Sequence, residues 1–125
     1  MAPVRRTELN FPRFIALTAA RTLLANESGA IVHNVGMTAG VVLTLPPIGD
    51  GPYWFKVIQG AGYAITVTAD LHDTMITFND ATADSVTFST SAEIIAGSFE
   101  VYCDGTSLWV LPQLASEAQT LTVST

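Results

Sequence analysis

The sequence is poor in cysteine, histidine and charge, and it contains no long apolar run. Among its 125 residues one is cysteine, two are histidine and 13% are charged. A single cysteine excludes an internal disulfide and is typical of a protein assembled in a reducing cytoplasm. No run approaches the roughly 18 apolar residues that a membrane-spanning helix needs, and no apolar segment follows the first residues. We therefore expect neither a signal peptide nor a transmembrane helix.

Basic residues are also few, and they are unevenly distributed. Four of the five, all arginines, lie in residues 1–21 with one acid, which gives this segment a net charge of +3. The rest of the chain contains Lys56 against ten acids, a net of −9, so that the whole chain carries −6. Because an acidic surface repels phosphates and anionic lipids, we expect neither nucleic acid nor a membrane as a partner of the folded domain.

With two histidines and one cysteine, the sequence offers little for catalysis or metal binding. His72 lies near Asp70 and Asp73, but the spacing matches no metal-ligand motif. Asp80 and Asp84 flank Ala-Thr-Ala without the glycine and glutamate of a calcium loop, which favours a turn between two strands. Phosphate-binding and nucleophile motifs are absent. We predict no catalytic residue, no metal and no cofactor, and therefore not an enzyme.

The single cysteine and the other histidine have simpler interpretations. Cys103 ends a run of β-type residues, and we expect a buried strand residue there. His33 follows Ile31 and Val32, and we expect it on the polar face of a strand.

What the sequence does contain is short runs of Val, Ile, Thr and aromatic residues between turn residues. Hydrophobic residues make up 49% of the chain, which indicates a folded domain. The predicted strands cover residues 14–17, 21–24, 30–34, 41–45, 53–59, 64–68, 75–78, 85–89, 98–103, 108–111 and 120–123. Their spacing is typical of a sandwich or barrel. We predict an all-β fold, an antiparallel β-sandwich of the jelly-roll kind or a small β-barrel, as one domain over residues 14–125 behind an extended basic arm over residues 1–13.

One predicted strand differs from the others because it is apolar on both sides. Residues 53–58 have the sequence Tyr-Trp-Phe-Lys-Val-Ile. Such a strand is either central in a sheet or has an outer face that meets a partner subunit. We take Tyr53, Trp54 and Phe55 as the candidate oligomer interface.

Three segments together resemble a known family. The first runs from Leu17 to Val32, with Ser-Gly at 28–29, and is followed by Val-Leu-Thr-Leu-Pro at 42–46. The second is the aromatic strand at 53–58, and the third is a closing hairpin over 98–110, in which Asp-Gly-Thr precedes a tryptophan strand. This pattern is similar to that of small β-sandwich proteins of tailed-bacteriophage virions. A chain of this length resembles a capsid decoration (cement) protein more than part of a fibre.

The resemblance implies a virion structural protein, made in the host cytoplasm, that forms a homotrimer on the capsid surface. It would stabilise the capsid by binding across neighbouring major capsid protein subunits. The basic arm then has a role in attachment, either to the capsid or to a neighbouring protomer, with charge steering the encounter and apolar side chains supplying burial. The candidate partner-binding residues are Arg5, Arg6, Leu9, Phe11, Arg13 and Phe14.

Two alternatives remain open. The first is a carbohydrate- or receptor-binding module of a phage tail or fibre, in which surface aromatic rings would form a platform. The candidate rings are Tyr53, Trp54, Tyr63, Tyr102 and Trp109, although their positions within predicted strands favour packing in the core. The second is a small enzyme of the cupin type, which would require a histidine cluster that the sequence lacks.

Overall fold

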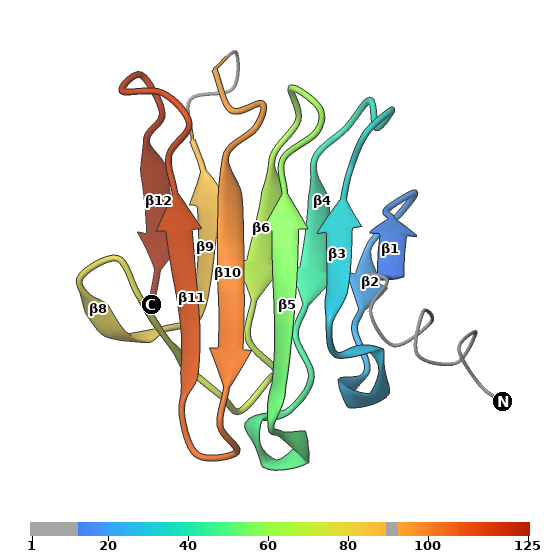
Figure 1. Cartoon of the computed structure of the whole chain (residues 1–125). Helices are drawn as coiled ribbons and strands as arrows, with labels where there is room; N and C mark the ends of the chain where they lie inside the picture. The colour runs from blue at the N-terminus through green and yellow to red at the C-terminus, as the bar shows by residue number, and fades with distance from the viewer. Residues whose placement is uncertain (1–12, 90–92) are drawn as a thin grey trace, which may run out of the picture.

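The computed structural model describes residues 13–89 and 93–125, which form two β-sheets packed face to face (Figure 1). The strands are β1 (Arg13–Ala16), β2 (Arg21–Thr22), β3 (Ala30–His33), β4 (Val41–Thr44), β5 (Tyr53–Ile58), β6 (Ile65–Thr68), β7 (Met75–Thr77), β8 (Asp80–Ala83), β9 (Ser85–Phe88), β10 (Ser98–Cys103), β11 (Leu108–Gln113) and β12 (Leu121–Ser124). Two single-turn 3-10 helices, η1 (Ala25–Glu27) and η2 (Ile48–Asp50), lie in the connections. In this part of the chain no helix is long and apolar enough to cross a membrane. The predicted all-β sandwich is confirmed.

The pairing within the sheets is mixed rather than antiparallel throughout. One sheet has the order β1-β3-β5-β10-β11-β7-β8, and the other β12-β9-β6-β4-β2. From β1 to β6 the chain crosses from one sheet to the other after every strand, and each crossing reverses its direction. Strands next but one in sequence therefore become neighbours that run the same way, as in the parallel pairs β1–β3–β5 and β2–β4–β6. The sequence prediction assumed hairpins, which pair neighbours antiparallel.

Hairpins do join two pairs of strands. The predicted turn at Asp104-Gly105 connects β10 to β11, and Gly105 has a φ of +93°. A second hairpin connects β7 to β8 through Phe78 and Asn79, which both have positive φ.

The prediction of a turn between Asp80 and Asp84 is therefore wrong, because residues 80–83 form β8. The carboxylate of Asp80 is engaged within the protein: Oδ1 accepts from the backbone N–H of Thr82 at 2.8 Å, and Oδ2 accepts from the hydroxyl of Thr125 at 2.7 Å. These bonds lower the pKa of Asp80.

The core lies between the two sheets and is built from the inward side of each strand. Val41 and Leu43 on β4 are buried and alternate with outward Val42 and Thr44, as the sequence pattern predicts. The rings of Phe55, Phe88 and Phe99 are almost completely buried there. The rings of Phe88 and Phe99 pack with their centroids 5.0 Å apart, a separation at which tilted aromatic pairs attract.

Three buried amide side chains tie the loops together at one end of the sandwich. Asn34 Oδ1 accepts from the N–H of Gly60 at 2.7 Å and of Ala61 at 3.1 Å, and its Nδ2 donates to the carbonyl of Tyr63. Gln59 bonds within the β5–β6 loop and to the N–H of Ile65. Gln119 joins the β11–β12 loop to the β9–β10 loop through the carbonyl oxygens of Glu93 and Ile95. Hydrogen bonds within the protein replace those that these buried amides would make to water, and so offset the cost of burying them. The amides thereby fix the conformations of the loops.

Candidate interaction face

The face of the seven-stranded sheet that points away from the core is here called the outer face, and it carries several exposed aromatic and aliphatic side chains. On β5 the side chains alternate, with Tyr53 and Phe55 facing the core at 3% and 0% exposure. Trp54 lies between them on the outer face and is 48% exposed. The candidate oligomer interface is therefore corrected: Tyr53 and Phe55 are core residues, and only Trp54 can meet a partner. The strand is apolar on both sides because one side is core and the other is this face.

Aromatic side chains from three adjacent strands form one row across the outer face. Trp54 on β5 pairs with Tyr102 on β10, and Tyr102 pairs with Trp109 on β11. Trp109 pairs in turn with Ile76 on β7. Neighbouring strands lie about 4.8 Å apart, so these side chains adjoin one another. We call Trp54, Tyr102, Trp109 and Ile76 the aromatic row.

The expectation that the surface-aromatic candidates pack in the core is wrong for most of them. Tyr53 is buried, and its hydroxyl donates to the carbonyl of Pro46 at 2.8 Å. Tyr102 is 42% exposed, Tyr63 is 48% exposed on the β5–β6 loop, and Trp109 is half-buried. The alternation of residues in β10 and β11 could have predicted the exposure of Tyr102 and Trp109. The inward positions are already occupied by apolar residues, which are Val101, Cys103, Leu108 and Val110.

An open cavity of about 390 Å³ adjoins the aromatic row. It is lined by Ser28, Pro52, Tyr53, Trp54, Tyr102, Cys103, Asp104 and Trp109. Its polar groups are engaged within the chain: Ser28 Oγ accepts from the N–H of Trp54, and Asp104 Oδ1 accepts from the N–H groups of Thr106 and Ser107. The last two bonds lower the pKa of Asp104. Cys103 is buried as predicted.

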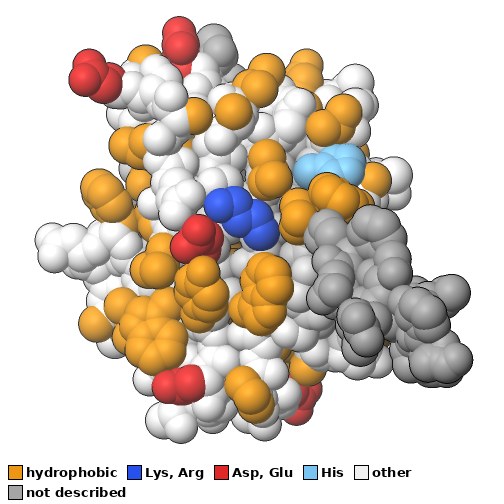
Figure 2. Space-filling view, viewed as in Figure 1, with side chains coloured by type: hydrophobic (Ala, Val, Ile, Leu, Met, Phe, Trp, Pro, Cys, Tyr) orange, Lys and Arg blue, Asp and Glu red, His pale blue; other side chains and the backbone are white. Residues whose placement is uncertain are grey.

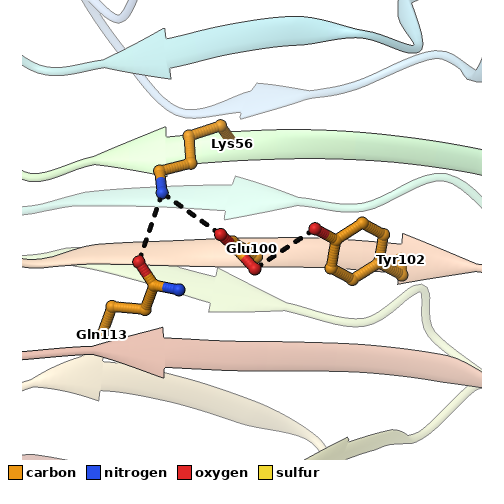
Figure 3. A network of polar contacts seen from close by, with 4 residues as sticks. All are labelled: Lys56, Glu100, Tyr102 and Gln113. Carbon is orange, nitrogen blue, oxygen red and sulfur yellow. Dashed lines mark hydrogen bonds and ion pairs between the residues drawn. The ribbon is translucent and has the colours of Figure 1, made fainter.

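A small polar network lies at the centre of the outer face (Figure 3). Lys56 Nζ on β5 lies 3.5 Å from Glu100 Oε2 on β10 and 3.4 Å from Gln113 Oε1 on β11, and Tyr102 donates to Glu100 Oε1 at 3.2 Å. The bond to Glu100 raises the pKa of Tyr102, since ionising the phenol would break it and place two negative charges together. Lys56 is the sole Lys or Arg after residue 21. The only lysine or arginine of residues 22–125 thus lies within an apolar face.

The outer face continues to the edge strand β1. Phe14 pairs with Ile31 on β3, and Ile31 pairs with Lys56. Phe14 is 64% exposed, so the face reaches the edge with an aromatic ring. Figure 2 shows hydrophobic side chains spread over this side of the molecule, around a central pair of one basic and one acidic side chain.

The predicted arm residues divide between two situations. Arg5, Arg6, Leu9 and Phe11 lie outside the described residues. Arg13, assigned by the sequence to the arm, is the first residue of β1, and Phe14 follows it on the outer face. The basic segment therefore enters the fold at the edge of the seven-stranded sheet.

Neither histidine belongs to a metal site in the described part of the chain, where no group of three or more His, Cys, Asp or Glu side chains is placed to hold an ion. His33 ends β3 on the outer face as expected, and its Nδ1 accepts from the N–H of Val35 at 3.2 Å. Near His72, the carboxylate of Asp73 accepts from the N–H of Ile48 at 2.8 Å, which is a structural contact.

Comparisons with protein-family models, with curated proteins and with solved structures gave no match.

Proposed function

We propose that this protein is a virion structural protein that decorates a phage capsid and stabilises it by binding across neighbouring major capsid protein subunits. In this proposal it acts as a homotrimer on the capsid surface after synthesis in the host cytoplasm. The role requires no catalytic residue and no cofactor, and it involves neither nucleic acid nor a membrane. The observation that carries the proposal is the outer face, an open apolar sheet surface that continues to β1, the strand at which the basic segment joins the fold.

Two properties of the molecule support a bracing role. A β-sandwich whose loops are tied by buried amides is a stiff body, and a brace must resist deformation to transmit load between subunits. The chain also offers two separate means of contact, the outer face and the basic N-terminal segment. A protein that holds neighbours together needs more than one contact surface.

We assign attachment to the basic segment, with Arg5, Arg6 and Arg13 steering the encounter and Leu9, Phe11 and Phe14 supplying apolar burial. Charged residues mainly accelerate association, whereas aromatic anchors in a desolvated contact dominate affinity. The segment carries a net positive charge on an otherwise acidic chain. Its partner is therefore expected to present acidic groups around an apolar contact.

Occupancy of expanded phage heads tests the proposal. Deleting residues 2–12, or replacing Arg5, Arg6 and Arg13 together by Ala, is expected to reduce occupancy measured by cryo-electron microscopy and to lower the temperature at which decorated heads release DNA. The matched control is Arg21→Ala. Arg21 is an exposed arginine that lies outside residues 1–13 and pairs with Glu27. Heads that bind the deletion variant as well as the intact chain would refute the assigned attachment, and heads that bind neither would refute the proposed function.

Recognition of a host glycan is the second candidate, and one observation favours it. The rings of Trp54, Tyr102 and Trp109 line the same open cavity, as rings that stack on sugars do. Within the described part of the chain, neither indole N–H donates a hydrogen bond to another residue. Because Trp54 and Trp109 are the chain's two tryptophans, titration of the intrinsic fluorescence with purified host surface polysaccharide tests this role. An unchanged spectrum would exclude it for that polysaccharide.

A further inference from the structure

The outer face carries a group of large apolar side chains that are exposed to solvent. Five of its large apolar side chains are at least 36% exposed: Phe14, Trp54, Ile76, Tyr102 and Leu111. They belong to two adjacent rows of the same sheet, because Trp54, Tyr102 and Ile76 share the aromatic row and Leu111 pairs with Glu100 in the next. No described strand or loop packs over this face (Figure 1). An exposed apolar surface of this kind is typical of an interaction site.

The charges on the face indicate which occupant fits. Lys56 and Glu100 lie directly opposite each other on the paired strands β5 and β10. Both side chains are 29% exposed, and they are 3.5 Å apart, which leaves each of them able to accept another partner. The centre of the face is electrically neutral as a whole, with one charge of each sign side by side. A strongly acidic or basic partner would match one charge and oppose the other.

We infer that the occupant of the outer face is a second copy of this chain, related by a two-fold axis that runs parallel to the strands between β5 and β10. Such an axis sets the outer faces of the two copies against each other. A residue on β5 of one copy then faces, on β10 of the other copy, the residue that pairs with it within one chain. Lys56 then meets Glu100 of the next copy, and Glu100 meets Lys56. The face is complementary to itself, as closed symmetric assembly requires. The inference rests on the proposed function for its biological setting, in which this pairwise contact links chains of neighbouring trimers.

The same operation can be followed for two further pairs of side chains. Trp54 meets Tyr102 of the next copy, which joins two aromatic rings, since these residues flank the axis in the aromatic row. One strand further out, Ile31 on β3 meets Leu111 on β11, which joins two aliphatic side chains. In these two rows the register thus brings ring against ring, aliphatic side chain against aliphatic side chain, and charge against opposite charge.

A glycan fits the face less well than a second copy does. The polar groups beside the aromatic row, Ser28 Oγ and Asp104 Oδ1, already bond to backbone N–H groups of the chain. Lys56 and Glu100 would remain partly desolvated beside a neutral sugar without gaining a charged partner.

Charge exchange provides the test. Lys56→Glu and Glu100→Lys are each expected to weaken self-association of the full chain at least about a hundredfold, because like charges would then face each other between copies. An equimolar mixture of the two variants is expected to associate again. In the mixed pair the introduced carboxylate of one variant faces the introduced ammonium group of the other, and the two unaltered side chains, Lys56 and Glu100, face each other. Mixing cannot restore the ion pair within one chain, because each variant still carries two like charges at positions 56 and 100. Recovery of association on mixing therefore shows that the charges act between copies.

Sedimentation velocity measures the association, and circular dichroism verifies that each variant is folded. Trp54→Ala is expected to weaken association, whereas Tyr63→Ala, a ring of equal exposure outside the face, is expected to leave it unchanged. A chain that stays monomeric up to about 1 mM, or variants that associate as the unaltered chain does, would overturn the inference. Because no heads are present, association without head occupancy would refute the proposed function alone. Head occupancy by trimers that do not associate through their outer faces would refute this inference alone.

Discussion

Gly97 lies against the ring of Phe88, so closely that a Cβ atom at position 97 would be 2.6 Å from Cζ of the ring. Phe88 is almost fully buried and packs on Phe99, so the ring has no room to retreat. We expect Gly97→Ala to lower the free energy of unfolding by about 1–3 kcal/mol, as overpacking of a core does, measured by urea denaturation.

The preceding residue provides the control for this prediction. Ala96 has a φ of +73°, and its N–H donates to the carbonyl of Gln59 at 2.7 Å. This conformation costs an alanine about 1 kcal/mol and a glycine almost nothing. Ala96→Gly is therefore expected to leave stability unchanged or to raise it by up to about 1 kcal/mol. A loss of stability from Ala96→Gly as large as that from Gly97→Ala would contradict the assignment of the effect at position 97 to added volume.

A second prediction concerns the amide that ties two loops together. Asn34→Ala removes the acceptor for two backbone N–H groups, those of Gly60 and Ala61, and the donor to the carbonyl of Tyr63. Leaving a buried polar group without a partner costs about 1–3 kcal/mol. We expect a loss of at least this size in urea denaturation, with faster hydrogen exchange at Gly60 and Ala61. Asn26→Ala, an exposed asparagine in η1, is the matched control and should change neither quantity.

The strands of the sandwich were largely predictable from the sequence, because alternation of apolar and polar residues marks a half-buried strand. The strand β8 was not predictable in this way. It is short and polar, and its turn uses Phe78 at positive φ, where a glycine or asparagine is the usual signal. The parallel pairing was equally hidden, because crossing between sheets leaves no mark in local sequence.

The outer face was predicted only in part, for a related reason. The double-sided apolar pattern at residues 53–58 indicated an interface, but it did not say which side faces outward. Phe55 and Trp54 are equally apolar in the sequence, and only the packing of Phe55 between the sheets assigns them to opposite faces. The predicted hairpin brings Trp109 beside Tyr102. Tyr102 comes next to Trp54 through pairing of β10 with the distant strand β5, which a single sequence does not specify.

A third prediction follows from the bond between Tyr102 and Glu100. Because this bond raises the pKa of the phenol, Glu100→Gln is expected to lower the Tyr102 pKa toward its ordinary value by removing the negative charge. The ring carbon Cζ, observed by NMR across an alkaline titration, measures the change. Glu117→Gln, which removes a charge from the β11–β12 loop, should leave the titration of Tyr102 unaltered. A Tyr102 pKa that stays raised after Glu100→Gln would contradict the assigned cause.

The last prediction concerns the pH dependence of stability at the hairpin between β10 and β11. The N–H groups of Ser107 and Thr106 bond to Asp104 and hold its pKa below the ordinary value of 3.8. The unfolded chain therefore binds the proton more readily than the folded protein. The contribution of Asp104 to stability is complete above the unfolded value and is lost as the pH falls through the lower folded value. Asp104→Asn keeps an acceptor at the same place but does not titrate. The stability difference between the unaltered protein and this variant should shrink as the pH falls below 3.8, measured by urea denaturation at each pH. Other carboxylates cancel in this difference, so a gap that stays constant across the acid range would show that the hairpin bonds do not depend on the charge of Asp104.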